Sequence, residues 1–222
     1  MLGRVRLFAA LPERARDELR SAASVAVLGA GQRLWRRGDR ARFVGVVIAG
    51  RCKLIREDSG REVIVDVAVP GDLLGAVGFA LDASCSSSVV CLRRARVLLI
   101  PSALVRAALQ RETLALAALA AELAAEVARL MGMVQSLSAG NVERRLACVL
   151  LALAERAGQP FPGGTFVPLR LRRADLAALS ATTLESASRC ISSWRRRKLL
   201  TPQPSGYLLH DVAALRAIAA GE

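Results

Sequence analysis

The sequence LRRADLAALSATTLESASRCISSWRRRKLL occupies residues 171–200 and has the pattern of two helices joined by a tight turn. Apolar residues recur at steps of three to five, as on one buried helix face: Leu176, Leu179, Leu184, Ala187, Ile191 and Trp194. Residues 180–183 supply the turn and a hydroxyl N-cap, and Thr182 with Glu185 matches the capping-box pattern. The pattern predicts a helix-turn-helix whose second helix spans residues 183–197.

The other face of the second predicted helix is polar. It carries Glu185, Ser188, Arg189 and Ser192. Arginine pairs with guanine and glutamate with cytosine in the major groove of DNA, so this face predicts base readout. The alternative for Glu185 is that the capping box holds its carboxylate. Trp194 is expected to anchor the core rather than to stack on a base.

The charge of the chain favours a polyanionic partner. Thirty-two Lys and Arg against 19 Asp and Glu give a net charge of +13. Eight basic and two acidic residues lie between Arg170 and Lys198, which predicts contacts with DNA phosphates. An arginine-rich composition alone would not explain this clustering. An acid on the DNA-facing helix also argues against an architectural protein that binds DNA without sequence preference.

Residues from about Ala26 to Pro101 are predicted to be all-β. Short β-forming runs are Phe43–Ile48, Lys53–Ile55, Val63–Val69, Val89–Leu92 and Val97–Ile100. Glycine turns separate these runs, a pattern typical of a β-sandwich or β-roll. A short helix over Leu11–Ala22 is predicted before them.

A long helix is predicted from Thr113 to Leu137. Apolar residues alternate at steps of four and three, at Leu116, Ala120, Leu123, Val127, Leu130, Val134 and Leu137. This heptad pattern is typical of a two-stranded coiled coil, so a homodimer with Leu116, Leu123, Val127, Leu130, Val134 and Leu137 in its interface is expected. Glu122, Glu126 and Arg129 are expected on the polar outside. The alternative is a helix packed only on its own domain.

Several shorter elements are predicted after the long helix. Ser138–Asn141 is a hinge, and Asn141 caps a helix over Val142–Ala157. A loop over Gln159–Gly164 and a strand over Thr165–Leu171 lead into the helix-turn-helix. A hairpin wing over 201–209 and a helix over Asp211–Ala220 end the chain.

Several fragments, taken in order, resemble the Crp/Fnr superfamily of bacterial transcription regulators. They are GQRLWRRGD at residues 31–39, the twelve-residue step from Gly38 to Gly50, PGDLLG at 70–75, NVERRLA at 141–147 and the helix-turn-helix. The resemblance covers nearly the whole chain. It implies an α+β fold with an N-terminal double-stranded β-roll of the cyclic-nucleotide-binding type (1–110), a dimerisation helix and hinge (111–140), and a C-terminal winged helix-turn-helix (141–222).

Within that superfamily, the recognition helix resembles the Fnr type, whose members bind TTGA-like half-sites. The resemblance implies that Arg189 contacts guanine, Glu185 the cytosine edge and Ser188 the outer A·T pairs. Residues at positions where relatives touch phosphates are Arg173, Thr183, Ser186 and Ser192. It further implies a homodimer on a pseudo-palindrome of double-stranded DNA, with RNA polymerase as a further partner. Activation and repression both remain open.

The residues argue against cyclic AMP as the signal. Ala76 stands where cyclic-nucleotide binders carry a glutamate for the ribose, and Ser86 where they carry an arginine for the phosphate. Without that guanidinium the charge-assisted bidentate contact is lost. A cyclic-nucleotide-responsive regulator of the Crp type is kept as an alternative, and the effector stays unknown.

Cysteine and histidine usage limits other chemistries. The five cysteines are Cys52, Cys85, Cys91, Cys148 and Cys190. Because no cysteine precedes Cys52, an Fnr-type iron–sulfur cluster is not expected. A single histidine, His210, argues against a metal site, histidine-ligated haem or an enzyme, so no catalytic residues or cofactors are predicted.

The cysteines are expected to be small buried side chains. Cys190 carries an alternative: it lies among arginines and near a helix that would lower its thiol pKa, which would suit a redox-controlled regulator.

The chain has no run of 18 apolar residues, no signal-peptide pattern and no CxxC pair. We therefore expect a cytoplasmic protein with no membrane partner.

Overall fold

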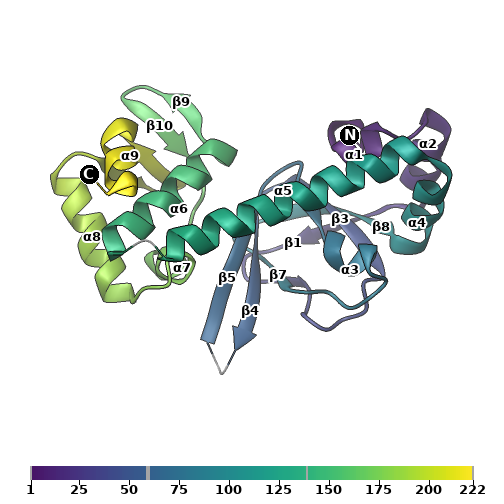
Figure 1. The fold of residues 1–222 in the computed structure, drawn as a ribbon, viewed down its shortest axis with the longest axis horizontal. Helices are drawn as coiled ribbons and strands as arrows, with labels where there is room; N and C mark the ends of the chain where they lie inside the picture. Colours follow the sequence, from purple (N-terminus) through teal and green to yellow (C-terminus); the bar gives the residue numbers. More distant parts are fainter. Residues whose placement is uncertain (1, 59–60, 139, 222) are drawn as a thin grey trace. The chain divides into compact units, whose positions relative to one another are not determined.

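A computed structural model describes residues 2–58, 61–138 and 140–221 (Figure 1). The chain forms two compact units, Met1–Gly60 with Val65–Arg129, and Arg61–Ile64 with Leu130–Glu222. The predicted α+β architecture of β-roll, long helix and winged helix-turn-helix is confirmed. The division between the units falls inside the long helix, after Arg129. The predicted segments are 1–110, 111–140 and 141–222, so this division lies within the segment expected to hold the dimerisation helix and hinge.

The β-roll follows short N-terminal helices. Its elements are η1 (Leu2–Arg4), α1 (Arg6–Ala9), α2 (Glu13–Ala22), β1 (Ser24–Leu28), β2 (Arg33–Trp35), β3 (Phe43–Ala49), β4 (Cys52–Asp58), β5 (Arg61–Ala68), β6 (Leu73–Leu74), α3 (Ala76–Ala80), β7 (Ser88–Cys91), β8 (Ala95–Pro101) and α4 (Ser102–Arg111). The strands form two four-stranded sheets, in the orders β1-β8-β3-β6 and β2-β7-β4-β5. All five predicted strands and the lead-in helix are confirmed.

Two apolar clusters hold this unit together. One contains Val47, Cys52, Leu74, Val89 and Val97 from strands of both sheets. The other joins the N-terminal helices to strands β3 and β8, and Phe8, Val44 and Ile100 are fully buried in it. The N-terminal helices therefore complete the core of the β-roll rather than only preceding it.

Gly50 makes the tight turn between β3 and β4 and offers a test of this fold. Its φ is +78°, and a Cβ there would collide with the carbonyl oxygen of Arg94. We expect Gly50→Ala to lower the free energy of unfolding by about 3 kcal/mol or more, since left-handed strain alone costs about 1–3 kcal/mol. Gly31→Ala is the matched control, because Gly31 has φ +75° and nothing within 4 Å of the added carbon. Urea unfolding curves that show equal losses for the two variants would contradict the predicted collision.

Helix α5 (Thr113–Ser138) has two contrasting faces. Ala115 and Leu119 are buried in the core of the first unit. Glu122 and Glu126 are half-buried and line a small cavity with Arg129, so their expected place on the polar outside is wrong. The 3.6-residue period puts these three residues on the side of Ala115 and Leu119, away from the heptad positions.

The heptad face of α5 is exposed and apolar. Leu116 is 53%, Val127 51%, Leu130 43% and Val134 63% exposed. Leu123 is half-buried against the first unit's core, and the Leu137 side chain lies outside the described residues. We call Leu116, Leu123, Val127, Leu130 and Val134 the α5 seam.

The second unit contains the remaining elements. They are α6 (Val142–Ala157), β9 (Gln159–Phe161), β10 (Gly164–Val167), α7 (Arg173–Leu179), α8 (Leu184–Arg196), β11 (Leu200–Gln203), β12 (Gly206–Leu209) and α9 (Val212–Ala220). The strands form one sheet in the order β11-β12-β10-β9.

Most predicted elements of this unit are confirmed, including the hairpin and the caps. The Asn141 side chain accepts a hydrogen bond from the backbone N–H of Arg144 at 2.8 Å, and Asp211 accepts one from Ala214 at 2.8 Å. Two predictions are wrong: Gln159–Phe161 pairs as β9 although a loop was expected, and β10 ends at Val167 rather than at Leu171. Residue 139 of the predicted hinge lies outside the described residues.

Among the residues that the structure describes, none of the helices has the length and apolar character needed to cross a membrane.

Candidate nucleic-acid interface

The turn between α7 and α8 is fixed by local hydrogen bonds. The buried Ser180 hydroxyl donates to the Leu176 carbonyl at 2.6 Å, and Ala181 adopts a φ of +45°. Thr183 is the N-cap of α8, and its Oγ1 accepts from the Ser186 backbone N–H at 3.2 Å. The predicted capping box of Thr182 and Glu185 is therefore wrong, because the cap lies one residue later and Glu185 is not three residues beyond it.

Helix α8 is strongly amphipathic. Its Ala187, Ile191 and Trp194 are fully buried, which confirms Trp194 as a core anchor. Leu184 is 49% exposed, so its predicted place on the buried face is wrong. It is the first residue of α8, directly after the N-cap Thr183, and its side chain lies outside the core.

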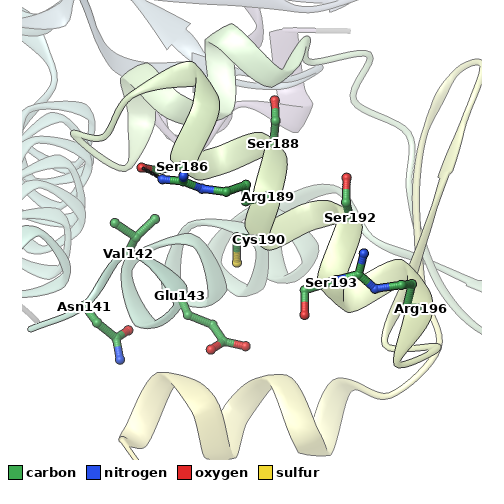
Figure 2. Close-up of a pocket in the computed structure, with 10 residues that line it drawn as sticks. All are labelled: Asn141, Val142, Glu143, Ser186, Ser188, Arg189, Cys190, Ser192, Ser193 and Arg196. Atoms are coloured by element: carbon green, nitrogen blue, oxygen red, sulfur yellow. Dashed lines mark hydrogen bonds between the residues drawn. The ribbon is translucent and has the colours of Figure 1, made fainter.

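The candidate base-contacting residues lie on the polar side of α8. Glu185 and Arg189 are exposed, one helical turn apart, and Ser188 is half-buried. Figure 2 shows the hydroxyls of Ser188 and Ser192 pointing away from α6. The pKa of the Glu185 carboxyl is lowered, first by a hydrogen bond from its own backbone N–H and then by the Thr183 hydroxyl. An ionised carboxylate suits an acceptor for the cytosine amino group.

The candidate phosphate-contacting residues differ in their exposure and in the hydrogen bonds that they already make. Arg173, the first residue of α7, is exposed, and Ser192 is half-buried. Thr183 and Ser186 already serve the N-cap, and a guanidinium N–H of Arg189 donates to the Ser186 hydroxyl at 3.3 Å. Exposed basic residues around them are Arg170, Arg172, Arg195, Arg196, Arg197 and Lys198. The second unit thus presents a strongly positive surface beside α8.

A groove of about 830 Å³ runs between the start of α6 and α8 (Figure 2). Among its described lining residues, Glu143 is the one acid, and Arg189 and Arg196 are the bases. Glu143 Oε1 accepts hydrogen bonds from Trp194 Nε1 and from the Arg197 guanidinium, both at 2.7 Å. Glu143 was not among the predicted site residues; the signal for it was a tryptophan expected to be buried, whose N–H needs an acceptor.

Cys190 does not have the properties of a reactive thiol. Its thiol points toward α6, where Val142 and Glu143 lie (Figure 2). Burial, and then the Glu143 charge, raise its pKa to about 12, with a smaller opposing effect of Arg197. The expected lowering of this pKa is therefore wrong, because the thiol is buried and, as the smaller cause, lies near Glu143. Cys52, Cys85 and Cys91 are buried as expected, and Cys148 is half-buried.

The β-roll holds a small cavity beneath α5, entirely within the first unit. Its volume is about 40 Å³, and its polar lining consists of Asp66, Asp72, Glu122, Glu126 and Arg129. Arg129 Nε lies 3.8 Å from Asp66 Oδ2, and burial is the main cause that raises the pKa of Glu126.

A cyclic nucleotide does not fit these residues. Pockets for small ligands measure about 300 Å³ or more, and an anionic ligand would face four carboxylates in this cavity. Ala76, expected at the position of the ribose-binding glutamate, is buried in the cavity wall, and Ser86, expected at the position of the phosphate-binding arginine, is exposed. Within the described ranges, no group of three or more His, Cys, Asp or Glu side chains could hold a metal ion.

Two family models match the chain. A cyclic nucleotide-binding domain matches residues 25–112, and a Crp-like helix-turn-helix domain matches residues 144–218. A search of curated protein sequences finds no match.

Solved structures with the same fold come from several bacteria. FixK2 from Bradyrhizobium japonicum has a TM-score of 0.79 at 20% identity, with 88% of this chain and 96% of that chain covered. TTHB099, a CRP-family regulator from Thermus thermophilus, has a TM-score of 0.73 at 23% identity, with 88% and 96% covered. CLP from Xanthomonas campestris, described as a c-di-GMP-responsive global regulator, has a TM-score of 0.71 at 20% identity, with 90% and 100% covered.

Proposed function

Because the chain belongs to the Crp/Fnr family of transcription regulators, we propose that it binds DNA sequence-specifically as a homodimer. Each α8 enters a major groove of a pseudo-palindrome with TTGA-like half-sites about one helical turn apart. One observation carries this proposal: α8 buries Ala187, Ile191 and Trp194 and leaves the ionised Glu185 exposed one turn before Arg189.

The pairing of an acid with an arginine supports sequence readout over nonspecific attachment. A carboxylate facing DNA is repelled by phosphates, so Glu185 lowers affinity unless it accepts a hydrogen bond from a base. Arg189 supplies the bidentate partner for guanine, and Ser188 contacts the outer A·T pairs. Arg173 and Ser192 contact the flanking phosphates, together with the hydroxyls of Thr183 and Ser186. An activator of this type also contacts RNA polymerase.

The exposed α5 seam supports a homodimer. An apolar stripe at heptad spacing is stabilised by burial against an equivalent helix. The half-exposed Leu116, Val127, Leu130 and Val134 would together bury a continuous apolar surface against a second copy. The two-fold axis of such a dimer would match the symmetry of an inverted repeat.

Cyclic nucleotides are not part of the proposed mechanism. We expect that cyclic AMP, cyclic GMP and cyclic di-GMP at 1 mM neither shift the unfolding midpoint of the protein nor change its affinity for DNA. The reason is the small cavity, in which four carboxylates face a single guanidinium, that of Arg129, which already pairs with Asp66. A ligand present at 100 times its Kd stabilises a protein by about 2.7 kcal/mol, so thermal unfolding would reveal it. A saturable shift with any of the three would show that the cavity opens for a nucleotide.

Selection from a random duplex library with the full-length, reduced protein tests the function without assuming a site. The expected product is an inverted repeat of two TTGA-like half-sites. Recovery of no motif, or of a motif without two-fold symmetry, would contradict the proposal.

A further inference from the structure

Three consecutive residues at the start of α6 hold three different parts of the second unit. Glu143 accepts hydrogen bonds from Trp194 and Arg197 at the end of α8. Arg144 Nε donates to the carbonyl of Ala219 in α9 at 2.8 Å. Arg145 Nε donates to the carbonyl of Ser180 in the turn before α8 at 2.9 Å. The first turn of α6 is therefore the polar junction of the helix-turn-helix unit.

The two hydrogen bonds that Glu143 accepts are short and directional, so they fix the orientation of the end of α8. One oxygen, Oε1, accepts from both donors at 2.7 Å, and charge-assisted bonds of this length are the strong ones. Trp194 is fully buried, so its indole N–H has no water to replace Glu143. Arg197 directly follows α8 as its C-cap residue, so both donors belong to the last turn of the recognition helix.

We infer that Glu143 is a positioning residue for DNA recognition: it fixes the rotation of α8 about its axis, so that Glu185 and Arg189 face the base edges. Trp194 follows Arg189 by five residues, which places the two side chains on well-separated sides of the helix. The hydrogen bond between Glu143 and Trp194 therefore sets the direction of Arg189, although Glu143 itself does not contact DNA. Arg145 holds the other end of α8 through the turn.

The charge of Glu143 counts against a direct role in binding phosphates. It is the acid of a groove whose described bases are Arg189 and Arg196, and it pairs with the exposed Arg197. Both effects weaken attraction to phosphates. Glu143 thus opposes nonspecific binding while it orients the residues for specific binding, so its removal should separate the two affinities.

The inference rests on the proposed function and is tested on the selected duplex and on a scrambled duplex of equal length. Glu143→Ala is expected to weaken binding to the selected site by about 10- to 100-fold, the usual range for a hydrogen bond to a charged group. Binding to the scrambled duplex is expected to stay unchanged or to become tighter. Glu143→Gln keeps an acceptor for Trp194 and should retain most of the preference. Glu155→Ala is the matched control, because it removes the same charge from an exposed position of the same helix.

The outcomes distinguish a failure of this inference from a failure of the proposed function. An unchanged preference in Glu143→Ala, or a parallel loss on both duplexes, would overturn the positioning role. If Glu143→Ala does not fold, Trp194→Phe decides instead: it removes the N–H donor together with part of the buried ring, and an unchanged preference would still overturn the inference. A wild-type protein that prefers no duplex would refute the proposed function itself.

Discussion

Val127→Glu is expected to leave the protein monomeric and to weaken binding to the complete inverted repeat by about 100-fold or more. Val127 lies in the middle of the α5 seam and is 51% exposed. A glutamate there would bring two like charges together across an apolar dimer interface, where their desolvation is costly. Linking two DNA-binding units raises affinity by about 10²–10⁴-fold, and a monomer forfeits this gain. Sedimentation equilibrium at micromolar concentration gives the oligomeric state, and a duplex titration gives the affinity.

Ala121→Glu is the matched control for this experiment. Ala121 is exposed on the same helix, and the helical period places it away from both the seam and the β-roll. It adds the same charge and should remain dimeric with wild-type affinity. Dimers of normal affinity in Val127→Glu would show that the seam is not the interface.

Arg189→Ala is expected to weaken binding to the selected site by about 10- to 100-fold and to remove the preference for guanine at one position of each half-site. A bidentate contact between arginine and guanine is worth about 1–3 kcal/mol of discrimination. Arg189→Lys keeps the charge but loses the planar fork, so it should restore nonspecific affinity without restoring the preference. Affinities for single-base variants of the site measure this directly. A guanine preference that survives in Arg189→Ala would exclude Arg189 as its reader.

The elements that sequence could predict are those with a strong local signal. Helix α6 was predicted over Val142–Ala157, because an asparagine cap begins it and a glycine follows it. The wing and α9 carry equally clear turn and cap residues. Strands β1, β2 and β6 and helices α3 and α4 were not predicted; for β2 and β6, three and two residues are too few to show a periodic pattern.

The missed features of the site depend on contacts between distant parts of the chain. Glu143 and Trp194 are 51 positions apart, and no spacing rule connects them. Glu122 and Glu126 look solvent-exposed in a heptad pattern, yet they are half-buried and line the cavity beneath α5 because the β-roll packs beside that face. Cys190 seemed surrounded by arginines, but burial of its thiol, and then the charge of Glu143, raise its pKa instead of lowering it. In each case, residues distant in the sequence set the burial, the hydrogen bonds or the pKa of the side chain.

Fluorescence anisotropy with a TTGAT-N4-ATCAA duplex tests the central claim most directly. A scrambled duplex of equal length serves as the control, with reduced protein and without effector at about 0.15 M salt. Sequence readout by Glu185, Ser188 and Arg189 predicts a preference of about a thousandfold or more, within the range of specific over nonspecific binding. Equal, weak binding to both duplexes would contradict it.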